Sequence, residues 1–229
     1  MPTFDIVRET TPKKSFRVAS VMGKFDLAST HIKERFVGDI HFGDDWQIGL
    51  IVGNSGTGKT TIAKELFPDS YVTNFDYKEQ SILDDFPKEI TVDQITRTFN
   101  SVGFSSPPSW LKPYSVLSNG QKMRVDLATS LLKDEPLIVF DEFTSVVDRE
   151  VAKIGSHAIQ KAIRRTNKKF IAVGCHFDVE DWLLPDWIFN TNDMTYSVTA
   201  KKKDQTLNSE YLKQKESPNI GKCLVNIII

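Results

Sequence analysis

A continuous apolar run that leads into a glycine-rich loop constrains the fold of this chain more than any other feature. Residues 48–52 read Ile-Gly-Leu-Ile-Val, which is typical of a strand buried on both faces of a sheet. The loop Gly53–Thr60 follows at once, and apolar side chains then recur at helical spacing from Ile62 to Phe67, before Pro68. This order of strand, glycine loop and helix predicts an α/β fold.

The loop matches the pattern G-x-x-x-x-G-K-[ST] at every defined position. Glycines let successive backbone N–H groups turn toward phosphate oxygens, and the following helix adds its positive end. We expect the Lys59 amine to reach the β- and γ-phosphates and the Thr60 hydroxyl to bind Mg²⁺. The alternative, a flexible surface loop, is disfavoured by the strand and helix around it. The expected nucleotide-binding residues are Gly53, Asn54, Ser55, Gly56, Thr57, Gly58, Lys59, Thr60 and Thr61.

The rest of the chain alternates between strand and helix patterns. Apolar runs at 137–140 and 170–173 flank a helical pattern at 150–165, which predicts a mostly parallel sheet. Two more helices are expected at 118–132 and at 91–99, the latter with Thr91 as its N-cap. These two helices would belong to a small helical insert.

Two regions favour antiparallel pairing instead. Residues 3–50 mix short extended runs with turns, and Phe16–Met22 favours a strand because it is rich in apolar side chains. Residues 187–198 predict a hairpin that turns at Asn192-Asp193. The expected fold is therefore a P-loop α/β domain over residues 1–200, with a mostly parallel core sheet, an N-terminal antiparallel β section and a helical insert at about 81–133.

Two carboxylates, Asp141 and Glu142, follow the apolar run at 137–140. Ligands of open α/β sheets bind at the carboxyl ends of the parallel strands, where this pair would lie. Asp141 is expected to hold Mg²⁺ and Glu142 to polarise an attacking water, because phosphoryl transfer needs an in-line water and charge neutralisation. Alone, such a pair would be interpreted as a solvated acidic turn, but the phosphate loop favours the functional interpretation.

The segment Leu117-Ser118-Asn119-Gly120-Gln121 resembles the L-S-G-G-Q signature of ATP-binding cassette (ABC) ATPases. Ser118 and the N–H groups of Asn119 and Gly120 would open a helix and form a second anion site, and Ser118 would also act as an ordinary N-cap. Asn119 replaces the usual first glycine, but asparagine tolerates the left-handed backbone region. In the family this site faces the γ-phosphate bound by a partner subunit, so the resemblance implies ATP between two head-to-tail copies.

The resemblance covers about residues 15–195 and implies further site residues. Asp148 ends the loop that crosses the dimer interface, and His176 contacts the γ-phosphate. Gln80 is the best candidate for the glutamine that touches Mg²⁺ and water, with a solvated loop glutamine as the alternative. Phe25 is expected to stack on adenine, although Phe16, Phe36, Phe42 and Trp46 compete. Within the family, the stretches at 110–122, 141–145 and 175–178 resemble those of soluble bacterial or phage cassettes that occur alone or joined to an acetyltransferase-like domain.

Composition limits the compartment and the partners. The net charge of −1 argues against a large basic surface, although Lys201–Lys203 and Arg164-Arg165 offer local cationic runs. Cys175 and Cys223 lack ligand spacing, and no apolar run is long enough to cross a bilayer, so we expect a cytoplasmic chain without a signal peptide. Residues 201–229 read as a polar, Lys-rich tail with a short apolar end.

Three functions remain open at this point. The first is a soluble Mg-ATP hydrolase that acts as a homodimer, with the purpose of turnover and any protein partner unidentified. The second is the nucleotide-binding subunit of a membrane ABC transporter, in which the aromatic residues between Gln80 and Ser118 would face a membrane partner rather than pack locally. The third is an ATP-switched module that binds nucleic acid or protein.

Overall fold

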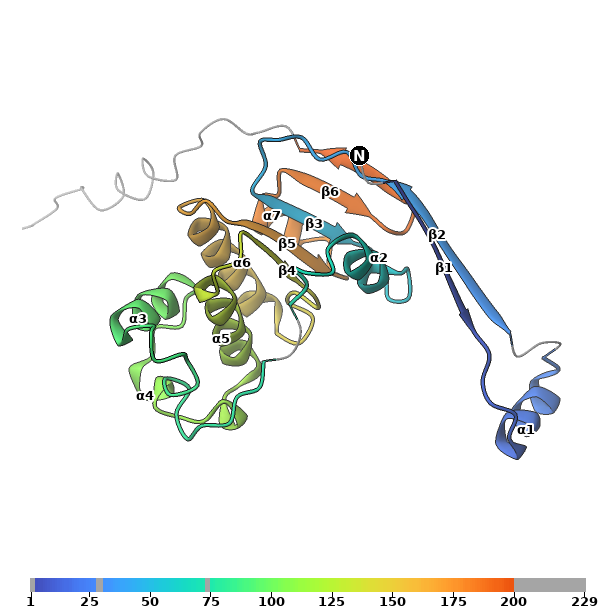
Figure 1. The fold of residues 1–229 in the computed structure, drawn as a ribbon, viewed down its shortest axis with the longest axis horizontal. Coiled ribbons are helices and arrows are strands. Elements are labelled where there is room, and N and C mark those ends of the chain that lie inside the picture. Colours follow the sequence, from blue (N-terminus) through green and yellow to red (C-terminus); the bar gives the residue numbers. More distant parts are fainter. Residues whose placement is uncertain (1–2, 28–30, 73–74, 200–229) are drawn as a thin grey trace, which may run out of the picture. The chain divides into compact units, whose positions relative to one another are not determined.

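The computed structural model describes residues 3–27, 31–72 and 75–199, so the predicted tail at 201–229 and Cys223 lie outside the described residues. Its centre is a five-stranded sheet in the order β4-β5-β3-β6-β7 (Figure 1). Neighbours from β4 to β6 pair in parallel, and β7 is antiparallel to β6. The strands are β3 (Ile48–Val52), β4 (Leu137–Phe140), β5 (Lys169–Gly174), β6 (Trp187–Asn190) and β7 (Thr195–Val198). The three predicted apolar strands and the C-terminal hairpin are confirmed.

Both faces of the sheet are covered, because side chains along a strand point alternately to opposite faces. On one face Leu50 and Phe170 belong to a core shared with α3, α5, α6 and α7. On the other face Ile51 and Ile171 pack with α2 and with β1 and β2. This two-sided burial explains why β3 is apolar without alternation. The helices are α2 (Lys59–Leu66), α3 (Val92–Ser101), α4 (Pro107–Trp110), α5 (Asn119–Leu132), α6 (Arg149–Ile163) and α7 (Val179–Leu183).

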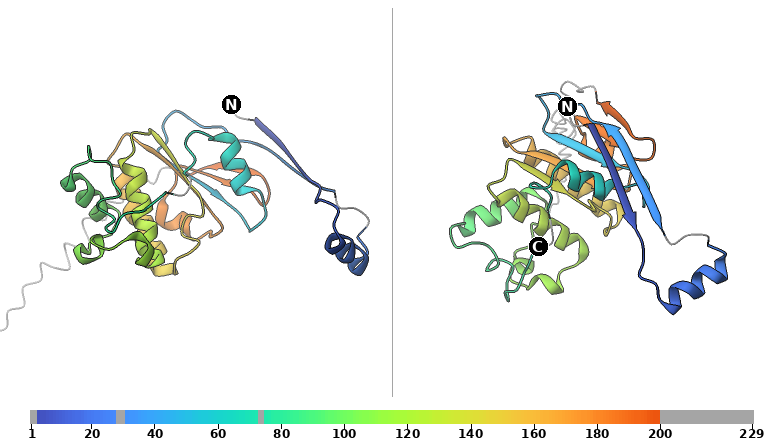
Figure 2. Two further views of the ribbon diagram at one scale, coloured as in Figure 1. Left: turned by 60° about the horizontal axis from the view of Figure 1, so that its bottom comes forward. Right: turned by 45° about the vertical axis from the view of Figure 1, so that its right-hand side comes forward.

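Helices α3, α4 and α5 gather in one group beside α6 (Figure 2). Both predicted N-caps are present: Thr91 Oγ1 accepts from the backbone N–H of Gln94, and Ser118 Oγ accepts from that of Gln121. In each case the side-chain oxygen of the third helical residue accepts a hydrogen bond from the backbone N–H of the cap residue. This second bond completes a capping box. The start of each helix is therefore encoded locally.

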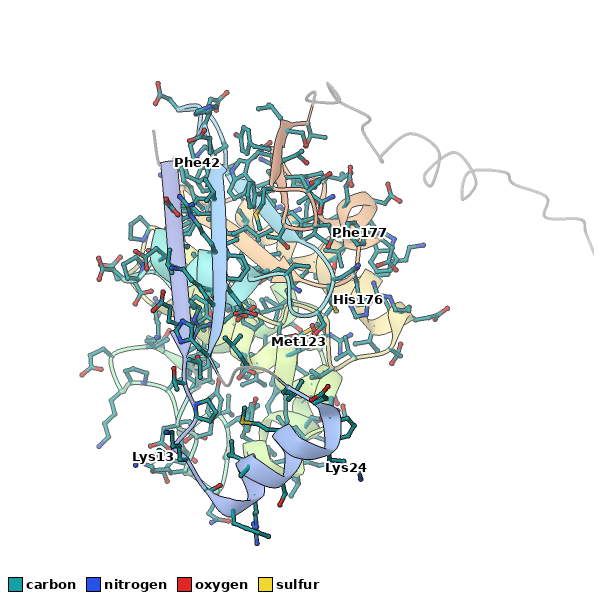
Figure 3. All side chains as sticks on the ribbon, turned by 90° about the vertical axis from the view of Figure 1, so that its right-hand side faces the viewer. Lys13, Lys24, Phe42, Met123, His176 and Phe177 are labelled. Carbon is teal, nitrogen blue, oxygen red and sulfur yellow. The ribbon has the colours of Figure 1, made fainter. Side chains whose placement is uncertain are left out.

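The predicted N-terminal antiparallel section is the pair β1 (Thr3–Thr10) and β2 (Ile32–Asp39), but the predicted strand at Phe16–Met22 is wrong. This segment lies in α1 (Phe16–Phe25), between the two strands. Ser15 Oγ accepts from the backbone N–H of Val18, which caps the helix, and the apolar side chains follow a helical spacing that their β-leaning composition hides. Lys13 and Lys24 lie at the two ends of this segment (Figure 3).

One carboxylate joins the start of β3 to the start of β6 and the end of α6. Asp186 Oδ2 accepts from the backbone N–H groups of Gln47 at 2.8 Å and Ile48 at 3.0 Å, and both carboxylate oxygens accept from the Arg164 guanidinium. Burial alone would raise the pKa of Asp186, but these hydrogen bonds outweigh it and hold the pKa below its ordinary value. Arg164, named above as part of a local cationic run, therefore forms an ion pair inside the fold.

Within the described ranges, no helix combines the length and the apolar character that a membrane crossing requires.

Candidate functional site

The glycine loop closes on itself around the backbone carbonyl of Asn54. The Lys59 amine donates to that oxygen at 2.7 Å, and the Thr57 hydroxyl donates to it at 2.9 Å. Gly56 and Gly58 have φ of 84° and 87°, in the left-handed region where a side chain is strained. Helix α2 begins directly after Gly58, so its free N–H groups lie at the loop. Left-handed glycines and free N–H groups at a helix start are features that an anion-binding loop requires, and the binding itself stays a prediction.

The loop is held by side chains that the sequence analysis did not assign to it. Asn192 Oδ1 accepts from the backbone N–H of Asn54 at 2.9 Å, and a Cβ on Gly53 would lie 2.2 Å from Thr191 Oγ1. A Cβ on Gly58 would lie 2.5 Å from the ring of Phe36. These residues lie in distant parts of the chain, in the β6–β7 turn and in β2, so no local sequence pattern predicts their contacts with the loop.

The structure brings Phe36 to the phosphate loop, and it does not bring Phe25 there. Phe36 pairs with Ile6 across β1 and β2 and is buried against the loop. Phe25 lies at the end of α1, beyond the Thr10–Ile32 end of the strand pair. The residue is 63% exposed, and the Lys24 amine lies over its ring. The expected adenine contact of Phe25 therefore has no counterpart in the described contacts of the loop.

The acidic strand end meets the phosphate loop directly. Thr60 Oγ1 donates to Asp141 Oδ2 at 2.8 Å, so the two predicted Mg²⁺ ligands converge. Tyr71, which the sequence analysis missed, donates its hydroxyl to the same oxygen. Burial and this hydrogen bond raise the pKa of the phenol, which stays protonated. Tyr71 reaches Asp141 because it forms a parallel bridge with Val139 of β4, a sheet contact that no local signal predicts.

The oxygens of Thr60 and Asp141 fit a magnesium ion. Mg²⁺ prefers hard oxygen ligands and usually keeps several waters, with one or two protein ligands and the phosphates of its substrate. A hydroxyl and a carboxylate that already converge at hydrogen-bonding distance provide such a pair. Among the described residues no cluster of three or more His, Cys, Asp or Glu side chains is present.

Glu142 adopts a backbone conformation that is rare for a residue with a side chain. Its φ is 51°, and its backbone N–H donates to Asp141 Oδ1 at 2.8 Å. The next residue, Phe143, is buried and donates its N–H to the carbonyl of Val173 at 2.9 Å, which ties this turn to β5. Left-handed residues cost about 1 kcal/mol or more and concentrate at functional sites. The turn thus holds the exposed Glu142 carboxylate beside Asp141.

Of the two remaining residues expected near the phosphate, one lies at a strand end and one does not. His176 follows β5, where Figure 3 labels it together with Phe177, and its Nδ1 lies 3.8 Å from Cys175 Sγ. Gln80 lies in an exposed turn. Within residues 3–27, 31–72 and 75–199, no hydrogen bond joins Gln80 to Asp141 or Glu142, whereas Tyr71 does contact Asp141.

The Leu117–Gln121 segment opens α5 as predicted, but Asn119 is not left-handed. It is the first residue of the helix, and the residues with positive φ do not include it. Glycine is needed one position later, because a Cβ on Gly120 would lie 2.8 Å from Val151 Cγ1 of α6. Gln121 also donates from Nε2 to Ser109 Oγ at 3.1 Å, which fixes the loop against α4. Leu117 is buried beneath it.

Asp148 caps α6 by accepting from the backbone N–H of Val151 at 2.9 Å. Between the start of α5 and the acidic pair lies a pocket of about 570 Å³. Asn119, Lys122 and Asp126 line its helical side. Asp141 and Glu142 line the opposite side, so the pocket connects the acidic strand end to the Leu117–Gln121 segment.

Comparison with solved structures identifies the fold. The dimeric structure of MJ0796, described as a bacterial ABC transporter cassette, matches with a TM-score of 0.52 at 15% identity and covers 69% of this chain and 87% of that one. A dimeric post-hydrolysis state of the same cassette, bound to ADP and Pi, matches with a TM-score of 0.57 at 15% identity, over 72% and 92% of the two chains. The chain has the ABC ATPase cassette fold.

Parts of this chain are also similar in sequence to curated ATP-dependent lipid A-core flippases. The cassette is 40% identical over 57 residues to the ATP-dependent lipid A-core flippase of Alkalilimnicola ehrlichii, which is 25% of this chain and 10% of the flippase. It is 25% identical over 173 residues to the flippase of Shewanella frigidimarina, over 68% of this chain and 27% of that protein. The cassette thus spans a small part of these relatives. No protein-family model matches it. The nearer resemblance to cassettes joined to an acetyltransferase-like domain stays a prediction.

Proposed function

We propose that the chain binds Mg-ATP and hydrolyses it at sites that two copies build together. The hydrogen bond from Thr60 Oγ1 to Asp141 Oδ2, at 2.8 Å, carries this proposal, because it joins the phosphate loop to the acidic strand end. Glu142 directly follows, held in a fixed turn beside Asp141. This combination of a phosphate cradle, two converging oxygen ligands and an adjacent carboxylate supports phosphoryl transfer to water.

Within one copy, the loop N–H groups and Lys59 hold the β- and γ-phosphates, and Thr60 and Asp141 hold Mg²⁺. When bound, the ion neutralises charge on the phosphates. The Glu142 carboxylate accepts a hydrogen bond from the attacking water and orients it in line with the γ-phosphorus. His176 donates to the γ-phosphate oxygens. Tyr71 keeps the Asp141 carboxylate in its orientation, whereas the Mg²⁺ contact expected of Gln80 stays a prediction.

The second copy completes each site. The signature segment Leu117–Gln121 presents the free N–H groups at the start of α5 to the γ-phosphate bound by its partner, and the loop ending at Asp148 lies across the interface. Dimers of the similar cassette MJ0796, one of them with ADP and Pi, support this arrangement. ATP then favours the closed dimer to the extent that it binds the closed state more tightly than the open one.

The test is to stop hydrolysis without removing nucleotide binding. Glu142→Gln is expected to bind Mg-ATP and accumulate as a dimer in light scattering coupled to size exclusion, whereas Glu89→Gln, a matched change of an exposed side chain, behaves as wild type. A Glu142→Gln variant that stays monomeric at saturating Mg-ATP would contradict the two-copy site. Lys59→Ala is expected to lose nucleotide binding, and unchanged affinity would refute the assignment of the phosphate loop.

A second candidate function is the nucleotide-binding part of a membrane transporter. The flippase relatives support it, since those proteins are named as ATP-dependent lipid A-core flippases. This second function uses the same nucleotide chemistry as the first and differs from it in the protein partner. Stable co-purification with a membrane-spanning protein encoded beside this chain would support it, and hydrolysis at full rate by the purified chain alone would favour the first function.

A further inference from the structure

Basic side chains recur at every fourth residue along α6 and the turn that follows it. Lys153, His157, Lys161 and Arg165 occupy positions i, i+4, i+8 and i+12. Residues four apart lie on the same side of a helix, each about 6 Å further along its axis. These four residues, here called the α6 track, span about 18 Å along the helix axis and turn gradually around it, and Lys153, Lys161 and Arg165 carry the positive charge.

His157, Lys161 and Arg165 of the α6 track line a groove of about 1180 Å³ between α3 and α6, and Lys153 lies one turn before them on the same helix. Arg97 contributes a further cation from the α3 side. No carboxylate lines the groove, and its polar residues are neutral hydrogen-bonding groups such as Thr98, Asn100 and Ser101. Between these polar groups the floor of the groove is apolar, with Leu131, Ile154 and Ala158, so an anion would be held by the cations and polar groups at its edges.

The cations of the α6 track are available to a ligand. Lys153, Lys161 and Arg165 are exposed and form no ion pair within the described part of the chain, although α7 packs against α6 and carries acidic residues. Arg149, one turn before the track, differs because it pairs with Asp178. Arg164, beside the track, is likewise committed to Asp186.

Like charges four residues apart on a helix repel each other. The repulsion affects the imidazole of His157. Burial lowers the pKa of His157, and the positive charges of Lys153 and Lys161 lower it further. On the α3 side Arg97 pairs with Asp93 of its own helix, whereas the described ion pairs include none of the track cations. A polyanion laid along the groove would relieve this repulsion.

We propose that the α6 track binds the sugar-phosphate backbone of a nucleic acid. Its regular step along the helix is similar to the step between neighbouring phosphates of a polynucleotide strand, and threonine, asparagine and serine are common phosphate contacts. No aromatic side chain lines the groove, so bases have no stacking platform and recognition is limited to the backbone. Binding is therefore independent of sequence and strongly salt-dependent. The near-zero net charge of the chain conceals this local line of cations.

Fluorescence anisotropy with the full-length chain tests this inference, using labelled single-stranded and duplex DNA of about 20 nucleotides, longer than a typical single-domain site. The triple variant Lys153→Gln/Lys161→Gln/Arg165→Gln removes three cations from the track. The control Lys13→Gln/Lys14→Gln/Lys88→Gln removes the same charge from exposed positions outside it. The track variant should bind at least tenfold more weakly, with a slope of log K against log salt that is smaller by about 2 to 3. The control should stay within twofold of wild type.

Three outcomes would overturn the proposal. The first is a wild-type affinity weaker than about 100 μM near physiological salt, below ordinary non-specific binding. The second is an equal loss of affinity and slope in the track variant and its control. The third is displacement of the DNA by polyglutamate of matched charge as readily as by unlabelled DNA, which would assign the groove to an acidic protein segment. ATP affinity of the track variant is measured separately, because this inference does not depend on the nucleotide site.

Discussion

The carboxylate of Asp126 should make the stability of this protein depend on pH in a direction opposite to that of an ordinary salt-bridged acid. Asp126 lies on α5 and accepts hydrogen bonds from the hydroxyls of Tyr77 at 2.9 Å and Tyr114 at 2.8 Å, whose rings stack with centroids 4.1 Å apart. Burial raises the pKa of Asp126 from 3.8 to about 6, and the two phenols and Lys122 offset only part of this effect.

The sign and size follow from proton linkage. Because the folded state holds the proton more tightly than the unfolded state, protonated Asp126 is tolerated and ionised Asp126 costs folding free energy. The free energy of unfolding therefore falls as pH rises from about 4 through about 6. A shift of about two units corresponds to about 3 kcal/mol, of which about 2 kcal/mol is lost between pH ~4.5 and ~7.5.

Urea denaturation of wild type and Asp126→Asn at both pH values measures this contribution. The asparagine keeps the shape of the side chain and has no proton to titrate, so its stability relative to wild type should improve by about 2 kcal/mol on going from pH ~4.5 to ~7.5. Asp84→Asn, at an exposed position, is the matched control and should show no such change. An Asp126→Asn variant with the same pH dependence as wild type would refute the reasoning.

Two further predictions concern the phosphate loop and the acidic strand end. Gly58→Ala adds a Cβ 2.5 Å from the Phe36 ring at a φ of 87°, so it should lose about 2 kcal/mol of stability and most ATP affinity. The matched control Gly56→Ala, at a φ of 84° with no atom within 4 Å, should lose only about 1 kcal/mol, and equal losses in urea denaturation would contradict the packing argument. Tyr71→Phe removes one hydrogen bond to Asp141, so it should lower kcat about tenfold while ATP affinity measured in EDTA changes less than twofold. Loss of ATP affinity in EDTA would instead assign Tyr71 to nucleotide binding.

Local patterns were sufficient for the sheet and for the loop at its centre. The apolar run at β3 and the glycines after it predict a two-sided strand and a phosphate loop, because each needs only neighbouring residues. The same reasoning failed at α1, where apolar composition favoured a strand and the cap at Ser15 was overlooked. Apolar content is a weaker guide than the spacing of the apolar residues and the identity of the residue before them.

Contacts between distant segments explain what the sequence could not predict about the site. Tyr71 reaches Asp141 only because its segment pairs with β4, and Phe36 reaches Gly58 only because β2 packs over α2. Asn119 does not use the left-handed region that asparagine tolerates, because Ser118 caps the helix and Asn119 is already its first residue. Each of these results depends on sheet order or helix packing, which no single window of sequence contains.

The contact of Gly120 with Val151 has a mechanical consequence. Because Gly120 has no side chain, the Val151 side chain of α6 packs directly against the first turn of α5, and Arg124 Nη1 donates to the Gly120 carbonyl within α5 at 3.2 Å. A side chain at position 120 would have to displace Val151 or push the two helices apart. Asp148 caps the same first turn of α6, so a substitution that separated the two helices here would also shift the Leu117–Gln121 segment relative to Asp148.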